Sequence, residues 1–395
     1  MWFETRLSDI AIFNPRETLK KGEVAKKIAM EQLQPFCRDV SSFDFAPFNG
    51  GMKFRNGDTI MARITPCLEN GKLAKVNVLN EDEVGFGSTE YIVLRAREGT
   101  DEDFLYYLVY SSYVRSAAIK SMVGSSGRQR VQMDVLENLP ILVPSYSDQQ
   151  KIGRTLKRID DKIALNQCIN KNLEEQAQVI FDMEFVEKNK SDNKNQKGWR
   201  NACLSDIAQT IVCGKTPSTK KPDYYGEDMP FITIPDMYNS VYITKTTRRL
   251  SMLGINSQKN KILPSNSVCV SCIGTAGLVS LVAEPSQTNQ QINTIIPLED
   301  ISSYFIFFLL KSLSNKIQNL GASGSTIPNL NKSQFSEIEI MIPPKTLLEE
   351  FDSIVAPFFN AILEHQYQIE YLSILRDTLL PRLMSGEIDV SNITL

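Results

Sequence analysis

Residues 151–180 read KIGRTLKRIDDKIALNQCINKNLEEQAQVI, and this stretch sets the architecture of the chain. Apolar residues recur in it at intervals of three and four positions, with two asparagines near the centre of the pattern. Such a seam is typical of a long helix that packs against a partner helix. The predicted seam positions are Ile152, Leu156, Ile159, Ile163, Asn166, Asn170, Leu173, Ala177 and Ile180.

A second segment near the C-terminus repeats this rhythm and predicts the partner helix. Its seam positions are Phe351, Ile354, Phe358, Ile362, His365, Ile369, Leu372, Leu379 and Leu383. We expect Pro357 to kink or restart the first turns, because proline removes a helix hydrogen bond. Asn166 and Asn170 are expected to fix the register against His365 or Gln368, as polar seam residues do. The alternative is that each helix packs on its own domain as a plain amphipathic helix.

Outside the helices the chain repeats itself. LSDIA at 7–11 recurs at 204–208, GSSG at 124–127 recurs as GASG at 321–324, and LPILVP at 139–144 recurs as IEIMIP at 338–343. Three motifs recur in the same order and at nearly the same separation, which indicates a duplicated unit rather than chance matches between loops.

Each unit begins with alternating or β-branched runs that predict strands, and continues with a helical segment, the glycine loop and a last strand. The predicted fold is α+β: two α+β domains alternate with two long helices that pair as an antiparallel coiled coil, related by a pseudo-twofold repeat. In the first unit we expect strands at 58–64, 73–79, 89–95 and 139–143 and a helix at 103–119. In the second unit we expect strands at 267–273, 278–283, 292–297 and 336–342 and a helix at 302–318. The expected boundaries are 1–147 and 199–344 for the domains, 148–186 for the first helix, 187–198 for a polar linker, and 345–395 for the second helix and tail.

Several phrases carry a resemblance to a known family. ARITPCLENGK (62–72) is specific, and FGSTEY (86–91), GKTP (214–217) and YYG (224–226) accompany it. With the order domain, helix, domain, helix, they make the whole chain resemble the specificity subunits of type I restriction-modification systems. The chain departs from the family pattern at Tyr224-Tyr225, where Tyr-Trp is common.

The resemblance implies that each α+β domain is a target recognition domain for one half of a bipartite site in double-stranded DNA. The helices would hold the domains apart and dock two methylation subunits, which bind S-adenosylmethionine and flip an adenine in each half-site; restriction subunits would join them. The chain itself would hold no cofactor and have no catalytic activity. Its first helix, about 35 residues at 1.5 Å each, would be about 50 Å long, which exceeds one turn of DNA.

The charge distribution fits a DNA partner although the net charge is −3. Residues 111–158 hold eight basic and three acidic side chains, and residues 191–262 hold eleven and six. From residue 337 onwards the chain holds three basic and ten acidic residues. This acidic surface suits a protein partner better than DNA phosphate.

Long polar side chains on glycine-permissive loops are the candidates for contacts with DNA bases and phosphates. The predicted DNA-binding residues are Arg63, Thr65, Lys72, Arg128, Gln129 and Arg130 in the first domain, and Lys215, Thr216, Lys220, Lys221, Tyr224, Ser325, Thr326 and Asn329 in the second.

Other classes of protein fit the sequence less well. A DNA methyltransferase would need an Asn- or Asp-Pro-Pro-aromatic motif, and Asn14-Pro15 and Pro343-Pro344 lack the rest of it. Cys269 and Cys272 have the spacing of half a zinc site without a second pair, so we expect no metal. No apolar run reaches membrane-span length and no signal peptide opens the chain, so we expect a cytoplasmic protein. A coiled-coil scaffold with two protein-binding domains, or a stand-alone DNA-modifying enzyme, remains the alternative function.

Overall fold

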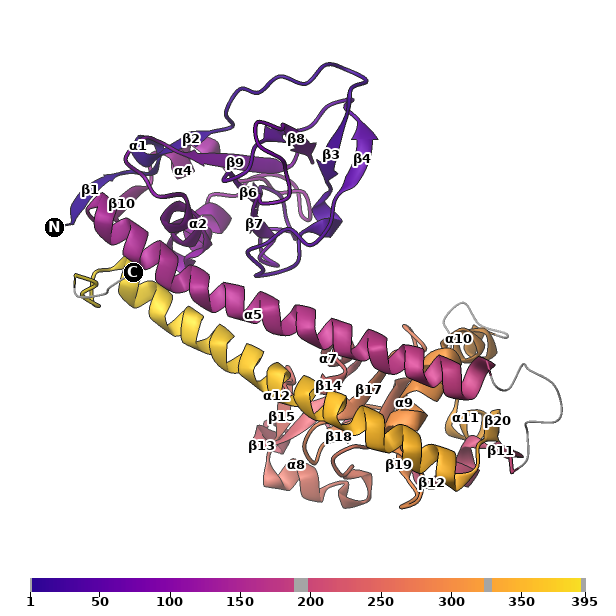
Figure 1. The fold of residues 1–395 in the computed structure, drawn as a ribbon. Helices are drawn as coiled ribbons and strands as arrows, with labels where there is room; N and C mark the ends of the chain where they lie inside the picture. The colour runs from indigo at the N-terminus through magenta and orange to yellow at the C-terminus, as the bar shows by residue number, and fades with distance from the viewer. Residues whose placement is uncertain (1, 188–197, 323–328, 392–395) are drawn as a thin grey trace. The chain divides into compact units, whose positions relative to one another are not determined.

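A computed structural model describes residues 2–187, 198–322 and 329–391. The chain divides into two compact units, of which unit 1 comprises Met1–Ile163 with Tyr371–Leu395, and unit 2 comprises Ala164–Glu370. Each unit contains one α+β domain and parts of two long helices, α5 (Tyr146–Phe181) and α12 (Lys345–Met384), as Figure 1 shows. The predicted linker lies mostly outside the described residues.

Unit 1 is built on two four-stranded sheets, with strand orders β2-β9-β6-β7 and β4-β3-β8-β5. All four residues of β6 (Thr59–Ala62) are buried, because β6 lies inside its sheet. The strands β1 and β10 form a separate antiparallel pair that closes the domain. The other strands are β1 (Phe3–Arg6), β2 (Ala11–Phe13), β3 (Val24–Ile28), β4 (Asp44–Pro47), β5 (Lys53–Phe54), β7 (Leu73–Lys75), β8 (Gly85–Gly87), β9 (Tyr91–Ala96) and β10 (Pro140–Val143).

Unit 2 repeats this plan with a five-stranded sheet β12-β19-β16-β17-β14, a three-stranded sheet β15-β13-β18 and the pair β11-β20. Its strands are β11 (Arg200–Cys203), β12 (Ala208–Cys213), β13 (Tyr225–Ile232), β14 (Tyr242–Ile243), β15 (Arg248–Leu250), β16 (Val268–Ser271), β17 (Val279–Val282), β18 (Gln287–Thr288), β19 (Ile292–Pro297) and β20 (Glu339–Ile342). The parallel pair β13-β18 matches β3-β8 of unit 1. The internal repeat and the α+β class are therefore confirmed.

The helix expected at 103–119 is two helices, α2 (Glu102–Tyr110) and α3 (Ser112–Lys120). Ser111 ends the first and caps the second, since its hydroxyl donates to Leu108 O at 2.6 Å and accepts from the Val114 N–H at 3.5 Å. The segment expected at 302–318 likewise divides into α9 (Ser303–Ser312) and α10 (Ser314–Ala322). A short helix follows in each unit: α4 (Met133–Glu137) and α11 (Lys332–Ser336).

The long helix α12 continues through Pro357, so the expected restart at this residue is wrong. Pro357 is exposed. The carbonyl group left without an N–H partner by the proline ring can therefore be hydrated, which makes the interruption tolerable.

The two long helices pack against each other in antiparallel directions. In unit 2 the Asn166 side chain donates to Gln368 Oε1 at 3.1 Å, and Asn170 Oδ1 lies 2.8 Å from His365 Nδ1. As the residue number increases along α5, the number of the partner residue in α12 decreases, which confirms the antiparallel pair.

Near the start of α12, the buried positions are shifted by one residue from the predicted seam. Val355 and Phe359 are fully buried, whereas Ile354 is 48% exposed and Phe358 is half-buried. These turns contact the domain as well as α5, so their buried face is wider than a two-helix seam.

Candidate nucleic-acid interface

Three loops of unit 1 that are distant in sequence meet at one end of the first sheet. The N–H of Arg63, just after β6, donates to Glu90 O at 2.9 Å, and the N–H of Val131 donates to Arg63 O at 2.9 Å. Ile64 forms a bridge with Arg130. The phrase at 62–72, the phrase at 86–91 and the glycine loop therefore form a single surface, which we call the reading surface of unit 1.

The glycine loop at 124–127 depends on its glycines. Gly124 has a φ of 132° and Gly127 a φ of 75°, both in the region that disfavours other residues. This turn returns the chain from α3 to Arg130 and leaves Arg128 exposed. The loop thus presents a cation to solvent beside the other two segments.

Arg130 is held by Glu90. Its Nε lies 3.1 Å and 3.0 Å from the two carboxylate oxygens of Glu90, and its Nη2 donates to Oε1 at 2.6 Å. The Nε of Arg63 lies 3.9 Å from the same carboxylate and makes no hydrogen bond. These hydrogen bonds from Arg130 lower the pKa of Glu90 below its ordinary value.

Thr65, Gln129 and Lys72 hold the loops together. Thr65 is only 7% exposed; its N–H donates to Gln129 O at 3.0 Å and its hydroxyl accepts the Gln129 N–H at 3.1 Å. Lys72 Nζ donates to Met30 O at 2.7 Å. Contact of Thr65 with DNA stays a prediction; in this structure its hydroxyl binds the loop backbone.

Unit 2 has the same backbone arrangement with other side chains. The N–H of Cys272 donates to Gln291 O at 2.8 Å, and the N–H of Leu330 donates to Cys272 O at 3.0 Å. Asn329, which is exposed, forms the bridge with Ile273. Gln291 and Asn329 thus occupy the places of Glu90 and Arg130.

The opening of the second domain adds to this surface. Lys215 is exposed and its N–H donates to Thr288 O at 2.9 Å, while the Thr216 hydroxyl donates to Gln290 at 2.6 Å. Lys221 Nζ lies 5.0 Å from the centre of the Tyr224 ring. Lys220 is also exposed. Ser325 and Thr326 lie outside the described residues.

The predicted helix-pair seam is buried to different degrees. Its buried members are Ile152, Leu156, Ile163, Asn166, Ala177, Phe351, Ile362 and Leu383. Its half-buried members are Ile159, Asn170, Leu173, Ile180, Phe358, His365, Ile369, Leu372 and Leu379, and Ile354 is exposed.

Sequence reasoning missed a buried ionic cluster in unit 1, where α2, α5 and α12 meet. Arg376 Nη1 donates to Asp160 Oδ1 at 2.8 Å, and the Tyr107 hydroxyl donates to Asp160 Oδ2 at 2.6 Å. Arg38 pairs with the neighbouring Asp161 at 2.6 Å. Asp160 lies next to the seam residue Ile159, where a charged side chain is ordinary, so the sequence pattern gave no signal of its burial.

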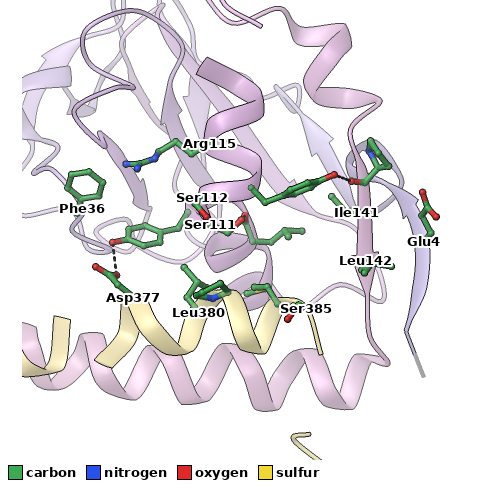
Figure 2. A pocket seen from close by; sticks show the side chains of 16 residues that line it. Glu4, Phe36, Ser111, Ser112, Arg115, Ile141, Leu142, Asp377, Leu380 and Ser385 are labelled. Atoms are coloured by element: carbon green, nitrogen blue, oxygen red, sulfur yellow. Dashed lines mark hydrogen bonds between the residues drawn. The ribbon is translucent and has the colours of Figure 1, made fainter. Parts of the chain in front are cut away.

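A cavity of about 690 Å³ lies elsewhere in unit 1, between α3, β10 and the end of α12 (Figure 2). Arg115 lies above the Phe36 ring at 4.9 Å, and the Tyr110 hydroxyl donates to Asp377 at 3.4 Å across it. Of the predicted DNA-binding residues that the structure describes, none lines this cavity.

The described residues include no cluster of side chains suited to a metal ion. Cys269 and Cys272 are both buried, and burial raises the pKa of their thiols to about 12 and about 11. Within the same described ranges, none of the helices has the length and apolar content required to cross a membrane.

Comparison with known proteins places this arrangement in a family. The family model described as the type I restriction modification DNA specificity domain matches residues 1–175 and 196–370. The type I restriction enzyme HindI specificity subunit of Haemophilus influenzae is 32% identical over 420 residues, covering 89% of this chain and 90% of that protein. The MjaIX specificity subunit of Methanocaldococcus jannaschii is 27% identical over 312 residues, covering 75% and 71%.

Among solved structures, the type I restriction-modification S subunit from M. genitalium has a similar fold. Its TM-score is 0.57 at 15% identity, and the alignment covers 97% of this chain and 96% of that one. The sequence matches and the repeated domain-helix order agree with the resemblance found in the sequence. The chain belongs to the type I restriction-modification DNA specificity family.

Proposed function

We propose that this chain is the sequence-specific DNA-binding subunit of a type I restriction-modification complex, which recognises a bipartite target. The observation that carries the proposal is the pair of equivalent surfaces: in each unit one backbone hydrogen bond joins a strand-end loop to the residue before β9 or β19, and a second joins it to the segment after the glycine loop. One framework that carries different polar side chains suits two half-sites of different sequence.

In this proposal the target recognition domains are residues 1–147 and 199–344, and the spacer helices lie in 148–186 and 345–395. The chain directs an adenine-N6 methyltransferase and restriction subunits to the site. Two methylation subunits bring the S-adenosylmethionine and the catalytic groups. The chain contributes specificity only, in keeping with the lack of an adenine-pocket motif in its sequence.

The test is selection of DNA from a random pool by the chain purified with its methylation subunit. The expected product is two short motifs separated by an unread spacer of fixed length. Recovery of unselected sequences, or of one contiguous motif, would contradict the proposal. Calorimetry of the chain alone with S-adenosylmethionine should show no binding.

A further inference from the structure

The Glu90–Arg130 pair leaves one edge of the arginine available. A guanidinium has five N–H groups. Glu90 engages the Nε–H and one N–H of Nη2, and the Arg128 carbonyl accepts one N–H of Nη1 at 3.5 Å. One N–H therefore remains on each terminal nitrogen. The side chain is 43% exposed, so the guanidinium lies partly open to solvent.

Another arginine of unit 1 shows the contrast with a structural pair. Arg95 donates Nε and Nη2 to Asp58 at 2.7 Å each, and its Nη1 donates to Glu17 at 2.7 Å. Asp58 is 1% exposed and Glu17 is nearly buried, so all three engaged donors of Arg95 bind buried carboxylates. Arg130 binds a single carboxylate, and its side chain is 43% exposed, compared with 28% for Arg95.

The equivalent positions of unit 2 are neutral. Gln291 replaces Glu90 and Asn329 replaces Arg130 on the same backbone framework, which is maintained without an ion pair. The charged pair is therefore not required to build the loops. A pair of parallel N–H donors matches O6 and N7 of guanine in the major groove, whereas side-chain amides match adenine.

We infer that Glu90 is a positioning residue that holds Arg130 so that its two available N–H groups bind a guanine in the half-site read by unit 1. The inference rests on the proposed function, because it requires that the reading surface of unit 1 faces the major groove. Glu90 fixes the plane of the guanidinium and limits its rotation, which restricts the base that it can accept.

The experiment uses the complex of the full chain with its methylation subunit and a duplex carrying the selected site. Each guanine of the site is replaced in turn by 7-deazaguanine, which lacks the N7 acceptor. With the wild-type chain, one guanine should show a loss of affinity of about 10-fold. With Arg130→Gln this loss should disappear, and with Glu90→Gln it should be reduced while melting temperature is unchanged.

Arg95→Gln is the matched control, because it removes an arginine from a similar carboxylate fork. It should lower stability and leave the 7-deazaguanine effect at the same position and size. The inference is overturned if no guanine of the site is sensitive, if Arg130→Gln keeps the sensitivity, or if Arg130→Gln weakens every sequence equally, as a phosphate contact would. A wild-type complex that prefers no sequence at all would overturn the proposed function as well, so the two failures are distinguishable.

Discussion

At the scale of single residues, Thr65 controls the glycine loop of unit 1 through its buried hydroxyl. Replacing Thr65 with valine keeps the shape of the side chain but removes the acceptor of the Gln129 N–H. An unpaired buried donor costs about 1–3 kcal/mol. We expect the Gln129 amide to exchange faster with solvent in Thr65→Val, and Thr65→Ser to behave like the wild type. Equal exchange rates in the valine variant would show that the hydroxyl does not hold the loop.

The Glu90–Arg130 pair also predicts how base preference depends on pH. The pKa of Glu90 lies below its ordinary value of 4.5, because Arg130 donates to its charged form. Its contribution is therefore fully present above that value and is lost only as the pH falls through the lower folded-state pKa. The guanine preference should be the same at about pH 7 and about pH 5.5 in DNA-binding titrations. A preference that declines within this interval would contradict the assignment.

The sequence indicated which residues lie on the reading surface, but not which partner each of them contacts. Arg63, Arg128 and Arg130 stand out in the sequence because they flank glycine-containing loops. Thr65 and Glu90 were harder to assign because each depends on a partner 64 or 40 positions away. Such partners follow from the pairing of loops, which no local pattern encodes.

At the scale of elements, the buried cluster joins α5 and α12 to the domain of unit 1. In Arg376→Met, Asp160 stays buried without its cation, and breaking one side of such a pair costs about 3–5 kcal/mol. Hydrogen exchange of the α2 amides under native conditions should report this loss. Replacing both residues, as Asp160→Leu with Arg376→Met, should recover much of the stability. Lys171→Ala removes an exposed ion pair with Glu175 and should change the free energy of unfolding by less than about 0.5 kcal/mol.

The long helices were predictable because a seam sustained over many turns gives a strong periodic signal. The second sheet of each domain was not foreseen: strands such as β5 and β18 have two residues each, too few to show alternation. The break at Ser111 depends on a cap that interrupts an otherwise continuous helical pattern. The buried face of α12 is shifted to Val355 because this helix also packs against the domain, and a two-helix seam does not take those contacts into account.

At the scale of the whole molecule, DNA binding must arise on a chain whose net charge is −3. Because phosphate contacts release counterions, the logarithm of the association constant should fall linearly with the logarithm of salt concentration. Lys220→Glu with Lys221→Glu should weaken binding to all sequences and reduce this slope, while the selected motif stays the same, since phosphate contacts carry no sequence information. Binding that ignores salt would favour the scaffold alternative.

The two units of the chain are expected to read two half-sites independently. The most direct measurement is a genome-wide map of methylated adenines in cells that express the methylation subunit with this chain, or with a version whose residues 199–344 come from another member of the family. We expect a bipartite motif in which only one half changes after the exchange. A map in which both halves change, or in which neither does while methylation persists, would contradict it.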